Sequence, residues 1–166
     1  MKEKLMNHYL NLGPRRFVIG TVLLLITLDI LSGLYLHLAW EQNGMAEKLI
    51  LRTIPPQDLA ELSAGTVTEM TGLATQSMHF LFFILMINNL FFYLFYLRKK
   101  LWAQGYVLVY AFSGAILSFG FLFDGTGMGL GWKIFNGLTV LVYLYLGLGV
   151  KYLKNETTHV PEKKGR

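Results

Sequence analysis

The sequence has no cysteine and little charge. Of its 166 residues, 15% are charged and 54% are hydrophobic. The absence of cysteine excludes disulfide bonds, thiolate metal sites and cysteine nucleophiles. The low charge is not typical of a soluble domain, in which about a quarter of the residues are charged.

The few charges are also spread unevenly along the chain. Within residues 17–40 and 76–97 the only formal charge is that of Asp29, and two further apolar segments lie at 101–123 and 130–150. A helix of about 20 apolar residues matches the roughly 30 Å hydrocarbon core of a bilayer. The sequence therefore predicts an all-α integral membrane protein, folded as an antiparallel bundle of four transmembrane helices.

Lysine and arginine are concentrated on one side of this predicted bundle. Twelve of the 15 lie near the N-terminus, in the turn after residue 97, or at the C-terminal end. Because basic residues mark the cytoplasmic side, we expect both termini in the cytoplasm and the protein in the bacterial inner (plasma) membrane. Residues 1–16 are then a cytoplasmic segment, 17–153 the transmembrane domain and 154–166 a cytoplasmic tail. The same bias explains the net charge of +5, so the sequence predicts the lipid bilayer and no nucleic acid as a partner.

Residues 41–75 are expected to form a long outer loop. Pro55 and Pro56 precede acidic side chains, a pattern typical of a helix start, which predicts a short surface helix from Gln57 to Ala64. From Thr66 the chain is expected to run as one helix into the second membrane segment. The loop is too small for an enzymatic domain, so we expect a lid or a docking surface.

Asp29 is the most informative residue because it lies near the centre of the first segment. An ionised carboxylate at that depth costs about 2.5 to 3.5 kcal/mol and needs a partner. Asn88 and Asn89 lie at the same depth in the second segment. Consecutive helical residues are about 100° apart, so only one of the two can face the first helix. The group is either a functional polar site or a hydrogen bond that holds two helices together.

Two histidines lie at a second matching depth. His37 is eight residues from Asp29, about 12 Å along a helix, and His79 is nine or ten residues from the asparagines, about 14 Å. Asp29, Gly33 and His37 share one helix face. We expect the aspartate, the asparagines and the histidines to line one polar path, although each histidine can instead simply bond a backbone carbonyl.

Small residues indicate where helices approach closely. Gly114 and Ser118 form a small-xxx-small pair in the third segment, and Gly33 is a further small residue on the first. We interpret all three as packing positions. No metal-ligand cluster and no nucleophile–base pair is evident, which argues against an enzyme without excluding one.

Three functions fit these features. The first is a channel or transporter subunit for protons or small cations, in which Asp29 and the asparagines form a midplane site; four helices scarcely enclose a pore, so this requires a homo-oligomer. The second is a non-catalytic structural or regulatory subunit of a larger membrane complex. The third is a redox protein that holds haem b between His37 and His79, with Gly33 making room for the ring.

Overall fold

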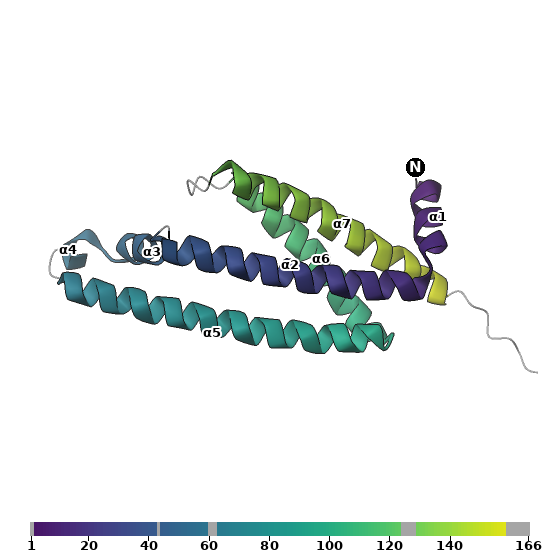
Figure 1. Ribbon diagram of the computed structural model, residues 1–166, viewed down its shortest axis with the longest axis horizontal. Coiled ribbons are helices and arrows are strands. Elements are labelled where there is room, and N and C mark those ends of the chain that lie inside the picture. Colours follow the sequence, from purple (N-terminus) through teal and green to yellow (C-terminus); the bar gives the residue numbers. More distant parts are fainter. Residues whose placement is uncertain (1, 43, 60–62, 124–128, 159–166) are drawn as a thin grey trace, which may run out of the picture. The chain divides into compact units, whose positions relative to one another are not determined.

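The computed structural model describes residues 2–42, 44–59, 63–123 and 129–158. Over these ranges the chain forms seven α-helices and no strand (Figure 1). In chain order they are α1 (Lys2–Leu12), α2 (Pro14–Gln42), α3 (Met45–Thr53), α4 (Pro56–Leu59), α5 (Ala64–Leu97), α6 (Leu101–Phe123) and α7 (Leu130–Thr158).

Four of these helices, α2, α5, α6 and α7, are long and apolar enough to cross a membrane. The predicted all-α class is therefore confirmed, and the four apolar helices indicate an integral membrane protein. The bounds of α6 are those predicted. Helix α2 begins three residues earlier than expected, at Pro14, because proline suits the first position of a helix.

Helix α5 begins at Ala64, well before the second apolar segment. Ser63 caps it: the backbone N–H of Thr66 donates to Ser63 Oγ at 3.2 Å, which satisfies one of the free N–H groups at the helix start. The continuous helix expected from Thr66 into the membrane segment is thus present. With 34 residues, α5 is about 50 Å long, more than a bilayer core requires.

The segment before α5 differs from the prediction. The expected helix over 57–64 is represented by α4, which has four residues, while residues 60–62 lie outside the described part of the chain. Ser63 is not helical because it caps α5. Helix α3 was not predicted; it ends where Ile54 becomes extended in front of Pro55, as residues before proline usually do.

The chain divides into two compact units. Unit 1 contains Met1–Leu25 and Phe91–Arg166, and unit 2 contains Ile26–Leu90. Helices α2 and α5 each contribute one part to each unit.

The centre of unit 1 is the contact between α6 and α7, which lie side by side (Figure 1). Helix α6 presents a stripe of small buried residues to this contact. Gly114 lies against the ring of Tyr143, so that a Cβ at this glycine would be 2.7 Å from the ring. Ser118 is also buried. The structure thus places Gly114 in a close contact with α7 and buries Ser118. The other buried residues of the stripe are Ala103, Val107, Ala111 and Ala115.

Helix α1 was not predicted, and it docks on the end of α7. Gly13 allows the chain to turn between α1 and α2 because its φ of 80° is unfavourable for other residues. The Tyr9 side chain is fully buried, and its hydroxyl donates to the backbone carbonyl of Tyr145 at 2.8 Å. The rings of Tyr9 and Phe17 cover Gly149, where a side chain would collide with both.

Candidate functional site: a row of polar contacts between α2 and α5

Unit 2 contains three polar contacts between α2 and α5, which we call the polar row. They join Asp29 to Asn89, His37 to His79, and Trp40 to Thr75. Residue numbers rise along α2 while those of the partners fall along α5. The contacts therefore follow each other along the same helix pair. At about 100° per residue, their spacing also places them on one face of each helix segment.

The first contact is the most deeply buried. Asp29 is 4% exposed and Asn89 is 0% exposed. Asn89 Nδ2 donates a hydrogen bond to Asp29 Oδ2 at 3.0 Å. Both a carboxylate and a carboxylic acid can accept this bond, so the contact persists whether or not Asp29 carries a proton.

Asn88 occupies the neighbouring position but has a different environment. Its side chain is exposed, whereas that of Asn89 is buried. This difference agrees with the angular argument that only one of the two amides can face the first helix. The structure therefore brings Asp29 and Asn89 together and leaves Asn88 on another face of α5.

The second contact lies about 12 Å along α2 from the first. His37 Nδ1 and His79 Nε2 are 3.0 Å apart, and the ring centroids are separated by 5.0 Å. Since a hydrogen bond needs one donor and one acceptor, one of the two nitrogens carries the shared proton and the other accepts it. His37 is half-buried and His79 is exposed on the surface of this chain. The structure thus brings together the two histidines that were paired by depth.

Gly33 and Phe82 separate these two contacts. The ring of Phe82 lies against Gly33 so closely that a Cβ at the glycine would overlap it. The structure thus places Gly33 against the ring of a phenylalanine. An apolar ring therefore interrupts the polar row between Asp29 and His37.

The third contact extends the row beyond the histidines. Trp40 Nε1 donates to Thr75 Oγ1 at 3.1 Å, and Thr75 Oγ1 in turn donates to the backbone carbonyl of Thr71 at 2.8 Å. Neither this contact nor the position of Phe82 was predicted from the sequence. Trp40 and Thr75 follow the same depth matching as the histidines, so the pairing was open to prediction, whereas the position of Phe82 depends on how α5 is rotated.

The polar row in this arrangement does not fit a haem. Axial ligation requires the two histidines to lie on opposite sides of the iron with the macrocycle between them. Here His37 and His79 are hydrogen-bonded directly, and Phe82 occupies the space beside Gly33 that was expected to accommodate the ring. Haem binding stays a prediction that the optical spectrum of the purified protein tests. In the described residues, no group of three or more histidine and acidic side chains has the geometry for a metal ion.

No relative carries an argument about this site. Comparison with protein-family models, with curated proteins and with solved structures found no match to the chain. Inference about function therefore rests on the chemistry of the polar row.

Proposed function

We propose that this protein is a membrane subunit that conducts or transports protons or small cations, with Asp29 and Asn89 as its midplane site. One observation carries the proposal: a buried carboxyl group and a histidine pair lie on the same helix pair, eight residues apart on α2. Ionisable groups inside a membrane segment are costly and usually mark an ion or proton path. The proposal concerns protons first, because all the titratable members of the row can bind and release them.

Each polar contact contributes a different step. Asp29 exchanges a proton through its carboxyl group while Asn89 keeps the side chain oriented. The histidine pair passes a proton along its shared hydrogen bond, because one ring nitrogen donates as the other accepts. Phe82 lies between these groups, so the ring has to move, or admit water beside it, for a proton to travel from one to the other.

The proposal includes a membrane orientation and an assembly. We place both termini in the cytoplasm of a bacterial cell, on the basis of the 12 basic residues near one end of the apolar segments. The four apolar helices then form an antiparallel bundle in the inner membrane, with residues 41–75 as the outer loop. Since four helices scarcely enclose a pore, we propose that copies of the chain associate as a homo-oligomer.

Proton flux into liposomes tests the role of Asp29. Asp29→Asn is nearly isosteric and can still accept a hydrogen bond from Asn89, yet it does not titrate. We expect this variant to fold and to lose most of the flux. Asn88→Leu is the matched control, because it removes an exposed amide at the neighbouring position and keeps Asn89, the donor to Asp29. It should retain the flux of the wild type at equal protein content.

Two results would contradict the transport proposal. One is equal flux in the wild type and in Asp29→Asn, which would mean that Asp29 contributes only a hydrogen bond. The other is no flux above empty liposomes for any form of the protein, under a proton gradient and under a cation gradient.

A non-catalytic subunit of a larger membrane complex is the second candidate, and the exposed surface of α5 favours it. Few residues in the apolar part of α5 are buried within this chain. Bulky side chains, among them Phe80, Phe83 and Leu94, are more than half exposed there. Lipid or the helices of another protein must cover them. Gentle detergent extraction distinguishes the candidates, because a structural subunit is expected to purify with a stoichiometric partner protein and the transport subunit with copies of itself.

A further inference from the structure

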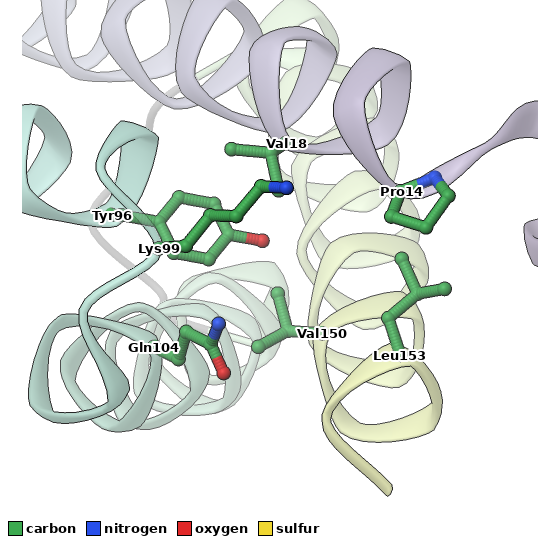
Figure 2. A pocket seen from close by; sticks show the side chains of 7 residues that line it. All are labelled: Pro14, Val18, Tyr96, Lys99, Gln104, Val150 and Leu153. Atoms are coloured by element: carbon green, nitrogen blue, oxygen red, sulfur yellow. The ribbon is translucent and has the colours of Figure 1, made fainter. Parts of the chain in front are cut away.

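A small pocket in unit 1 has a lining that no part of the proposed transport path uses. It is formed where the ends of four helices meet, and its volume is about 60 Å³, room for about two water molecules or a similarly small polar group. Its lining residues are Pro14 and Val18 of α2, Tyr96 of α5, Lys99 of the following turn, Gln104 of α6, and Val150 and Leu153 of α7 (Figure 2).

The turn between α5 and α6 holds Lys99 at this pocket. Lys99 has a φ of 56°, a left-handed conformation that usually requires glycine. The backbone N–H of Lys99 donates to the carbonyl of Tyr96, and that of Lys100 donates to the carbonyl of Phe95. These two bonds form a Schellman motif, which ends α5. A lysine therefore stands at a position where the backbone favours a residue without a side chain.

Three polar groups are directed into the pocket. Figure 2 shows the Lys99 ammonium near the Tyr96 hydroxyl, and the Gln104 amide further along the lining beside Val150. The Gln104 Oε1 atom is buried without a hydrogen-bond partner among the described residues. A buried polar group normally has a partner, and an amide oxygen needs a donor, which a water molecule or a ligand hydroxyl in the pocket would supply.

The other lining residues of the pocket are apolar, and the surroundings of the pocket are basic. Pro14, Val18, Val150 and Leu153 supply hydrocarbon surface. No aspartate or glutamate occurs within two positions of any lining residue in the sequence. Exposed basic side chains stand next to the lining residues, namely Arg15, Arg98, Lys100 and Lys151.

The pocket also lies at the ends of the four apolar helices. It is bordered by the first turns of α2 and α6 and by the final apolar turns of α5 and α7. At the end of an apolar span the hydrocarbon core gives way to the polar headgroup region. Phosphate, hydroxyl and acyl chain therefore occur together there, which matches the mixed lining.

We propose that this pocket binds the phosphate group of an anionic phospholipid beside Lys99 and Tyr96, with a headgroup hydroxyl donating to Gln104 Oε1 and the acyl chains outside the pocket. Lysine is a common ligand of phosphate, and basic clusters beside membrane helices recognise anionic lipids. The site is independent of the polar row, which lies in unit 2.

The thermal unfolding midpoint of the full chain in a neutral detergent tests this site. Ligands that bind the folded state raise the midpoint in a saturable way. We expect phosphatidylglycerol to do so, and phosphatidylcholine with the same acyl chains and inorganic phosphate to have little effect. A free phosphate site would instead respond to inorganic phosphate alone, and a general lipid requirement would respond equally to both lipids. Either of these results would overturn the proposal.

A pair of variants separates the pocket from general charge attraction. Lys99→Asn removes the cation, and asparagine tolerates the left-handed backbone. This variant should require about tenfold more phosphatidylglycerol to reach half of the maximal shift in the unfolding midpoint. That is the effect of losing one charge-assisted hydrogen bond. Lys100→Asn removes the same charge from the next residue, which is outside the pocket lining. This control should need less than about threefold more phosphatidylglycerol for the same shift in the unfolding midpoint. Equal losses in the two variants would overturn the proposal.

A further variant guards against damage to the turn. Lys99→Asn could lower the unfolding midpoint in the absence of lipid. In that case Lys99→Gly is used in its place, because glycine suits the φ of 56°. The same tenfold loss is expected for Lys99→Gly, and a lipid response like that of the wild type would reject the role of Lys99.

Discussion

At the scale of the residue, position along a helix decides which polar side chains meet. Asp29 and Asn89 are 60 residues apart in the sequence and are joined by a buried hydrogen bond. Their equal depth follows from counting residues along two apolar segments. Depth alone left Asn88 and Asn89 as alternatives, because choosing between them requires the rotation of α5 about its axis.

The two adjacent asparagines give a matched test of this bond. Asn89→Leu should weaken the contact between α2 and α5 by about 1 kcal/mol, the scale of interhelical hydrogen bonds in membranes, and it leaves the Asp29 carboxyl without this donor. Asn88→Leu should change stability by less, since its side chain is exposed. Unfolding in detergent with increasing denaturant measures both. A larger loss for the Asn88 variant would contradict the assigned contact.

Phe82 shows what the sequence could not supply at this scale. The expectation for Gly33 was that the absence of a side chain leaves space on α2. That space is taken by a ring from α5, one of several phenylalanines in an apolar segment with no distinguishing pattern. Apolar positions lack the pairing chemistry that made the histidines and Asp29 recognisable.

At the scale of the element, α6 and α7 are held together by small residues that admit aromatic rings. Gly114 is the closest of these contacts in α6, with the Tyr143 ring 2.7 Å from the position of an added Cβ. Gly120, six residues further along the same helix, has no neighbouring atom within 4 Å of an added Cβ.

These two glycines predict opposite effects of the same substitution. Gly114→Ala should destabilise the α6–α7 contact by about 1 to 3 kcal/mol, the usual cost of overpacking. Gly120→Ala should be neutral or stabilise the protein by up to about 1 kcal/mol, because alanine favours the helix over glycine. Thermal unfolding of both variants provides the comparison, and a similar loss in both would show that backbone flexibility matters more than ring packing.

Helix α1 is attached to α7 through a tyrosine whose ionisation opposes docking. Burial raises the pKa of Tyr9 to about 12, and the nearby Tyr145 and Tyr152 hydroxyls add to the effect. The pKa of a tyrosine in an unfolded chain is about 10. Below pH 10 the Tyr9 phenol is neutral, and its burial contributes fully to docking. This contribution is lost as the pH rises from 10 through 12, where the phenol loses its proton.

A fluorescent label on α1 can follow this transition. The chain has no cysteine, so Asn7→Cys introduces a single labelling site at an exposed position. We expect α1 to undock between pH 10 and 12 in this protein. With Tyr9→Phe the hydrogen bond to Tyr145 is absent at every pH, which weakens docking by about 1 kcal/mol, and the transition should disappear. An unchanged transition in Tyr9→Phe would assign it to other groups, such as lysines.

At the scale of the whole molecule, the apolar segments were the most predictable feature. Composition and length alone placed 101–123 as observed in α6, because a membrane span needs little more than an uninterrupted apolar helix. Helices α1 and α3 were missed because they are short, partly polar, and stabilised by contacts or turns rather than by apolar length. The pocket at Lys99 escaped prediction for another reason: its lining comes from four helices that are far apart in the sequence.

The proposed orientation predicts that both ends of the chain are on the cytoplasmic side. A protease-sensitive tag placed after Arg166 should be protected in intact cells and cleaved in inside-out membrane vesicles. A second tag between Ile54 and Pro55 should show the reverse, because that position belongs to the proposed outer loop. Cleavage of the tag after Arg166 in intact cells would overturn the assignment of the cytoplasmic side.

The contact between Tyr9 and Tyr145 also has a consequence for the order of events during synthesis. The two residues are 136 positions apart, and chains are made from the N-terminus at about 5 to 20 residues per second. Helix α1 therefore leaves the ribosome roughly 7 to 27 seconds before its docking surface on α7 has been made. During this interval Tyr9 lacks its native acceptor, and its burial has to wait for the last helix. Docking of α1 is thus one of the latest steps of folding, and a docked α1 indicates that α7 is already in place.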